Sequence, residues 1–188
     1  WWTGDAQPVR LHDDTRERTT GTKGARAGRP LAVVRGLDAS RHFTKTYRRR
    51  AGTLFQGRDD CRVPTLEACV ACLLELGLTP NVEIKPTAGL AVETAEVALT
   101  RLLKLWPDAR LPPLVSSFER ASLAAARRVA PHWPRGFLAE DFPAAWRQAM
   151  DELGCASMHM YWRRPRRAAV AAAQAAGRAF AVYPVDGG

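Results

Sequence analysis

From about residue 60 onward, short apolar runs alternate with longer stretches in which apolar residues recur every three or four positions. The short runs predict strands and the periodic stretches predict helices. Residues 81–85 are strand-sized, and the apolar positions from Val92 to Trp106 predict a helix that Pro107 ends. Further strands are predicted at 114–118, 136–138, 155–160 and 179–183, and helices at 65–76, 123–129, 143–153 and 166–176.

This alternation predicts a parallel sheet covered by helices, which fits either a closed (β/α)8 barrel or an open doubly wound sheet. Polar residues favour the barrel, because the carboxyl ends of barrel strands converge on one mouth where catalytic groups collect. Those at or near strand ends are His12, Glu83, Lys85, Ser117, His159 and Tyr183. No glycine-rich phosphate loop follows the first strand, which disfavours a dinucleotide fold. We therefore predict an α/β fold of the TIM-barrel type, as a single domain over residues 1–188.

The stretch 15–60 departs from this rhythm. It holds many glycines and charges and shows no sustained periodicity. We interpret it as an inserted loop-rich segment with room for one short helix.

Composition narrows the class of protein. The 188 residues correspond to about one domain, and 46% are hydrophobic, as in soluble globular chains. We expect no membrane span, because the longest apolar run is far below the roughly 20 residues needed. Four cysteines in a chain this long make no disulfide framework, which predicts a cytoplasmic location. Cys69 and Cys72 form a lone C-x-x-C on a predicted helix, and we expect buried thiols rather than a zinc or redox site.

The charge balance raises the question of an acidic partner. Lys and Arg number 28 against 19 Asp and Glu, a net charge of +9. The excess lies in two clusters, 48–50 and 163–167, with Tyr47, Tyr161 and Trp162 beside them. Charge supplies non-specific affinity for nucleic acid but no specificity, so we favour a solvated surface over a nucleic-acid site.

Two groups of residues could carry chemistry. His12 follows a predicted strand at 8–11 and is flanked by Asp13 and Asp14, which would suit a general acid. Glu83 and Lys85 project the same way from their strand, where two inward charges are costly unless they are paired or functional. They could form a buried ion pair, point outward under a helix, or provide a cation-binding carboxylate and a phosphate-binding lysine.

Four segments together resemble one family. Residues 8–20, PVRLHDDTRERTT, are similar to the "PV-x-x-HDDT-x-ERTT" segment of glycerophosphodiester phosphodiesterases of the bacterial cytoplasmic type. Residues 37–39 resemble their "LDAG", residues 63–67 their "IPTLEE", and residues 81–87, NVEIKPT, their "N-[IV]-EIKPT". The resemblance covers nearly the whole chain.

The resemblance implies a TIM barrel with a small insertion. It also implies hydrolysis of glycerophosphodiesters to glycerol 3-phosphate and an alcohol, with a divalent cation, in glycerophospholipid metabolism. His12 would be one of two catalytic histidines, Glu83 a metal ligand and Lys85 a phosphate-side cation. Phe118 would line the glycerol pocket, and Tyr183 would be the aromatic residue at the mouth. A lysine and a cation suit a transition state that gathers negative charge on phosphate oxygens.

The departures from the family pattern lead to a further expectation. The opening segments "HRG", "PENT" and "E-x-D" do not occur ahead of His12, and Pro184 with Asp186 replaces the terminal "T-V-N". We therefore expect an incomplete barrel that lacks its opening strands. We also expect Mg²⁺ or Ca²⁺ to bind weakly. We expect the chain to be a weak catalyst. The alternatives are a non-catalytic remnant that binds a partner and, less favoured, a basic nucleic-acid binder.

Overall fold

The computed structural model describes residues 29–40, 61–164 and 167–183. The chain forms two compact units, Trp1–Glu75 and Leu76–Gly188, and each is described by itself. The strand expected at 8–11, His12 and most of the segment 15–60 lie outside the described residues. The assignment of 1–188 to a single domain stays a prediction.

The first unit contributes two helices, α2 (Leu31–Arg35) and α5 (Leu66–Glu75). Asp38 pairs with Arg62 in an antiparallel bridge, and Val34 and Val63 pack together in a small core. The helix expected at 65–76 is therefore confirmed. The expectation of two buried thiols on α5 is wrong, because Cys72 is exposed and Cys69 half-buried. Cys72 lies away from the side of the helix that buries Val70.

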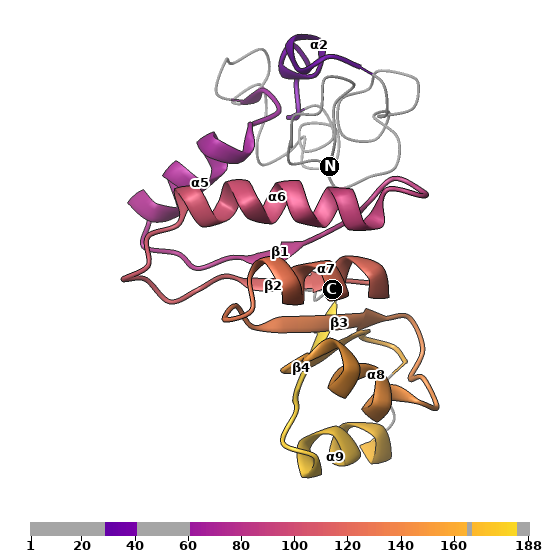
Figure 1. Cartoon of the computed structure of the whole chain (residues 1–188). Coiled ribbons are helices and arrows are strands. Elements are labelled where there is room, and N and C mark those ends of the chain that lie inside the picture. The colour runs from indigo at the N-terminus through magenta and orange to yellow at the C-terminus, as the bar shows by residue number, and fades with distance from the viewer. Residues whose placement is uncertain (1–28, 41–60, 165–166, 184–188) are drawn as a thin grey trace, which may run out of the picture. The chain divides into compact units, whose positions relative to one another are not determined.

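The second unit is a parallel sheet with a helix in each connection (Figure 1). The strands are β1 (Asn81–Glu83), β2 (Leu114–Ser117), β3 (Arg135–Ala139), β4 (Ser157–Tyr161) and β5 (Ala179–Tyr183). The helices are α6 (Ala91–Leu105), α7 (Arg120–Val129), α8 (Trp146–Leu153) and α9 (Arg167–Ala175). Every helix and strand predicted after residue 60 is present, with ends shifted by a few residues. The strand order follows the sequence, β1-β2-β3-β4-β5, as in a barrel, whereas the order of a doubly wound sheet reverses at a switch point.

The sheet has two faces of opposite character. On the helix-facing side, Phe137, Met158 and Met160 pack against α7, α8 and α9 in the main hydrophobic core. The other side, which we call the inner face, carries a row of small and polar residues. The residues that register places side by side in this row are Glu83, Ser116, Gly136, Ser157 and Ala179.

The sheet curves strongly toward its inner face. Phe118 follows β2 and Tyr183 ends β5, yet their ring centroids are 5.7 Å apart. Two strands lie between β2 and β5, so a flat sheet would separate them by three spacings of about 4.8 Å each. The contact across this gap is the curvature expected of a barrel wall.

Helices α6 and α8 end at the proline and the glycine that the sequence predicts as their ends. Pro107 follows α6, where its ring and missing N–H prevent another helical turn. Gly154 closes α8 in a left-handed conformation, with φ of 61°, which glycine adopts without steric cost. Both turns then direct the chain into the next strand. Within the described residues, no helix is both long and apolar enough to cross a membrane.

Candidate active site

Four of the five predicted site residues come together at one edge of the sheet. Glu83 ends β1, Lys85 follows it, Phe118 follows β2 and Tyr183 ends β5. The strands are parallel, so these positions share the carboxyl edge, where α/β barrels hold their active sites. His12, the fifth, lies outside the described residues. The roles of all five stay predictions.

Glu83 and Lys85 form an ion pair that is open to solvent. The Lys85 Nζ lies 3.9 Å from Glu83 Oε1, and the side chains are 33% and 31% exposed. A fully buried pair, one of the alternatives considered from the sequence, is therefore wrong. An exposed pair at this distance contributes little to the stability of the fold.

Phe118 and Tyr183 form the aromatic part of the edge. Their rings meet edge to face at 89°, and the Tyr183 hydroxyl donates to the Ala139 carbonyl at 3.1 Å. Burial raises the pKa of Tyr183 to about 12, and the carboxylates of Glu140 and Glu83 act in the same direction. The hydroxyl therefore stays protonated at neutral pH and serves as a hydrogen-bond donor.

Ser117 ends β2, as predicted from the sequence, but its side chain does not face the inner side of the sheet. It faces the helices and is fully buried. Its hydroxyl donates to the Ile84 carbonyl at 2.6 Å and accepts from the Glu119 N–H at 3.1 Å. It thus fastens the end of β1 to the end of β2 and holds the turn that carries Phe118.

His159 occupies the inner face one layer below the edge. It is buried, and its Nε2 lies 2.8 Å from the Ser157 hydroxyl. Gly136 leaves room for the ring, since a Cβ there would lie 2.6 Å from Nε2. Burial lowers the pKa of His159, so the imidazole is neutral at pH 7.

Glu140 and Tyr161 also lie at this edge and were not among the predicted site residues. Glu140 directly follows β3, and Tyr161 ends β4. The alternation of Ser157, His159 and Tyr161 along β4 is a signal that could have placed Tyr161 on the inner face. Glu140 closely follows the predicted strand 136–138, and this polar position near a strand end is the signal that could have found it.

The described residues do not by themselves make a divalent-cation site. Among residues 29–40, 61–164 and 167–183, no group of three His, Cys, Asp or Glu could hold a metal ion. Glu83 offers a carboxylate, whereas Mg²⁺ and Ca²⁺ take about six oxygen ligands. We therefore derive no step through a cation from these residues.

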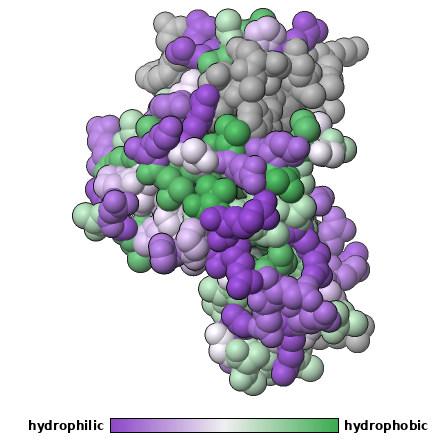
Figure 2. Space-filling view, viewed as in Figure 1, coloured by the Kyte–Doolittle hydropathy of each residue, from purple (hydrophilic) through white to green (hydrophobic). Residues whose placement is uncertain are grey.

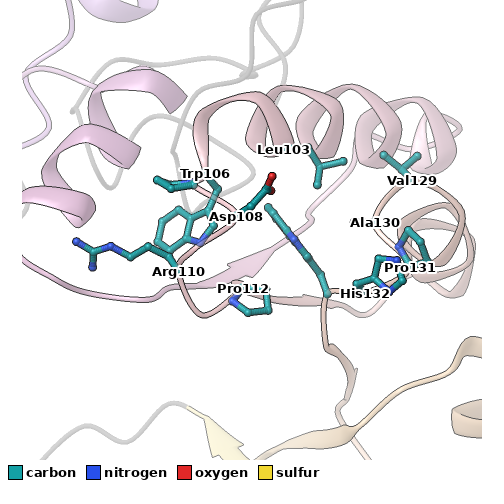
Figure 3. Close-up of a pocket in the computed structure, with 11 residues that line it drawn as sticks. Leu103, Trp106, Asp108, Arg110, Pro112, Val129, Ala130, Pro131 and His132 are labelled. Carbon is teal, nitrogen blue, oxygen red and sulfur yellow. The ribbon is translucent and has the colours of Figure 1, made fainter.

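A separate pocket of about 320 Å³ lies at the opposite, amino edge of the sheet (Figure 3). Leu103 and Val129 from the ends of α6 and α7 line it, together with Trp106 and His132. Apolar side chains also gather over α6 on this side of the molecule (Figure 2). The loop residues that line the pocket come just before β2 and β3 in the chain. The pocket therefore lies at the opposite edge of the sheet from Glu83 and Lys85.

Comparison with known proteins agrees with this geometry. The sequence model of the glycerophosphoryl diester phosphodiesterase family matches residues 2–187. A glycerophosphodiester phosphodiesterase of Caldanaerobacter subterraneus subsp. tengcongensis is 29% identical over 136 residues, which are 72% of this chain and 51% of the relative. The chain thus spans about half the length of that curated relative.

Solved structures match the fold over almost the whole chain. An Oleispira antarctica phosphodiesterase, solved with the product sn-glycerol-3-phosphate, has a TM-score of 0.86 at 31% identity, covering 98% of this chain and 70% of that one. A putative glycerophosphoryl diester phosphodiesterase from Silicibacter pomeroyi has a TM-score of 0.76 at 20% identity, covering 98% and 71%.

The fold is therefore that of an α/β protein of the TIM-barrel type. Within that class, the chain belongs to the glycerophosphoryl diester phosphodiesterase family. The family and the fold predicted from the sequence are both confirmed.

Proposed function

We propose that the protein hydrolyses glycerophosphodiesters to glycerol 3-phosphate and an alcohol, as part of glycerophospholipid metabolism. The observation that carries the proposal is the solvent-open Glu83–Lys85 pair beside Phe118 and Tyr183 at the carboxyl edge, in a chain of this family. The product bound to the Oleispira relative, sn-glycerol-3-phosphate, supports the same reaction.

In the proposed reaction, water attacks phosphorus and the bond between phosphorus and the alcohol oxygen breaks. The Lys85 ammonium binds a phosphate oxygen and stabilises the negative charge that grows there. Phe118 packs against the glycerol carbons. His12 acts as the general acid, giving its proton to the departing alkoxide, and the proton lost by the attacking water passes to solvent.

A divalent cation, Mg²⁺ or Ca²⁺, is part of the proposal, with Glu83 as one ligand. Such a cation would add charge stabilisation at the phosphate. We expect it to bind weakly, because the described residues hold no group of three potential metal ligands and water must fill several positions. The cytoplasm remains the proposed location, supported by four cysteines that are all free thiols.

The test is release of glycerol 3-phosphate from glycerophosphocholine by the 188-residue chain, with Mg²⁺, with Ca²⁺ and with a chelator. We expect cation-dependent release that Glu83→Gln lowers by about 10²- to 10³-fold. Asp108→Asn, at the opposite edge, is the matched control and should leave the rate unchanged. A rate equal to that of the Caldanaerobacter relative would overturn our expectation of a weak catalyst.

Binding provides a second readout that does not depend on turnover. Calorimetry with glycerol 3-phosphate should show that Lys85→Met weakens binding about tenfold, since a charge-assisted contact is lost. If the wild-type chain shows no turnover and does not bind glycerol 3-phosphate, the alternative is favoured, namely a non-catalytic family member.

A further inference from the structure

The carboxyl edge carries a continuous row of four aromatic side chains. The Phe118 ring contacts Tyr183, the Tyr183 ring lies 6.4 Å from Tyr161, and the Tyr161 ring lies 6.5 Å from Trp162. We call Phe118, Tyr183, Tyr161 and Trp162 the aromatic row. Its members come from the ends of β2, β5 and β4, so the curvature of the sheet assembles it.

The two ends of the row are exposed to solvent. Trp162 is 49% exposed and Phe118 38%, while both tyrosines are half-buried. Contiguous exposed apolar side chains on a folded protein are typical of a ligand-binding or interaction site. Each ring also presents a negative face, to which cations are attracted.

The row already holds one cation. The Arg163 guanidinium lies 4.7 Å from the centre of the Trp162 ring, within the roughly 6 Å range of cation–π attraction. Arg164, the next arginine, is paired with Asp141 at 3.2 Å. A cation therefore already lies over the Trp162 end of the row.

Negative charge lies beside the tyrosine part of the row. Tyr183 donates to the carbonyl of Ala139, next to Glu140, and the Glu140 carboxylate acts electrostatically on Tyr183. In the described part of the chain, Glu140 has no ion-pair partner, whereas Glu83 has Lys85. Among the residues that the structure describes, the Glu140 carboxylate thus lies beside Tyr183 without an ion-pair partner, and the Tyr183 ring contacts Tyr161.

We infer that Tyr161, Tyr183 and Glu140 bind a quaternary ammonium group, that of the alcohol released from the substrate. This inference rests on the proposed function and specifies its substrate as a choline-type glycerophosphodiester. A quaternary ammonium is bulky and holds water weakly, so aromatic faces and one carboxylate suffice to bind it. A neutral alcohol of the same shape gains only the apolar contact.

The first experiment measures binding without catalysis. Choline is titrated into the 188-residue chain by calorimetry or ligand-observed NMR, against 3,3-dimethyl-1-butanol, its uncharged carbon analogue. We expect choline to bind about three- to tenfold more tightly than the analogue. Tyr161→Leu and Glu140→Gln should each remove most of that difference, Tyr161→Phe should retain it, and Asp108→Asn should not affect it. Equal binding of the two compounds would overturn the inference.

The second experiment measures hydrolysis of two diesters, glycerophosphocholine and the glycerophosphodiester of 3,3-dimethyl-1-butanol. We expect a kcat/KM ratio of about three to ten in favour of choline, falling toward one in Tyr161→Leu. Hydrolysis of both diesters at equal efficiency would refute the ammonium site and leave the proposed function standing. Selective choline binding without hydrolysis of either diester would refute the function and leave the ammonium site standing.

Discussion

The two faces of the sheet are formed by the same strands but bury different kinds of side chain. On the helix-facing side, Val115, Met158 and Met160 are fully buried among apolar neighbours. On the inner face, Ser116, Ser157 and His159 are as deeply buried but polar. Parallel strands normally place apolar residues on both faces, because both are covered. The difference shows that stability is concentrated on the helix side, whereas the inner face is kept polar at a cost in stability.

The largest effect expected on the helix side comes from its charged residue, Arg135. This buried guanidinium donates to five carbonyls, those of Ala130, Pro131, Trp133, Leu153 and Gly154. It therefore joins the ends of α7 and α8 to the start of β3. Burial lowers the pKa of Arg135, because no solvent compensates its charge.

Arg135→Met should lower the free energy of unfolding by about 3 kcal/mol, because five acceptors lose their donor in a buried place. Urea denaturation followed by circular dichroism measures this. The matched control is Arg128→Met, which removes an exposed ion pair with Glu96 and should cost less than about 1 kcal/mol. Equal losses in the two variants would mean that Arg135 does not organise this end of the sheet.

On the inner face, the close contact between Gly136 and His159 predicts a smaller effect. Gly136→Ala should cost about 1–3 kcal/mol, because the new methyl group would overlap the imidazole and crowd Ser157. His159→Ala in the same chain should recover part of that cost. A double-mutant cycle by urea denaturation gives the coupling, and strict additivity of the two substitutions would rule out this contact.

The pH dependence of stability sharpens the comparison further. Burial lowers the pKa of His159 below its usual value near 6.5, so the unfolded state binds the proton first as pH falls. Protonation of this imidazole therefore favours the unfolded state. The free energy of unfolding decreases as pH falls below about 6.5. His159→Gln should flatten this slope by at most about 1.4 kcal/mol per pH unit. Carboxylates contribute to both proteins and cancel in the difference, and identical slopes would contradict a buried neutral imidazole.

Most of the fold could be predicted from the sequence, and part of the site could not. Periodicity identified the helices and strands, since a strand of alternating residues and a helix such as α6 have distinct patterns. Ser116 and Ser117 are adjacent and face opposite sides, and nothing in the sequence decides which one faces inward. The contact between Phe118 and Tyr183 depends on curvature summed over several strands, which no local pattern encodes. Glu140 lies at the edge because it directly follows β3, whereas its electrostatic effect on Tyr183 of β5 likewise depends on the curvature.

The sequential strand order has a consequence for how the chain acquires its structure. Each strand pairs with the one made just before it, so every new strand–helix unit meets a partner that has already left the ribosome. The contacts of the sheet are thus short in sequence, which favours fast folding relative to sheets with distant pairings. The second unit can therefore grow from β1 toward β5 during synthesis. The aromatic row, which needs β5, would be the last part to form.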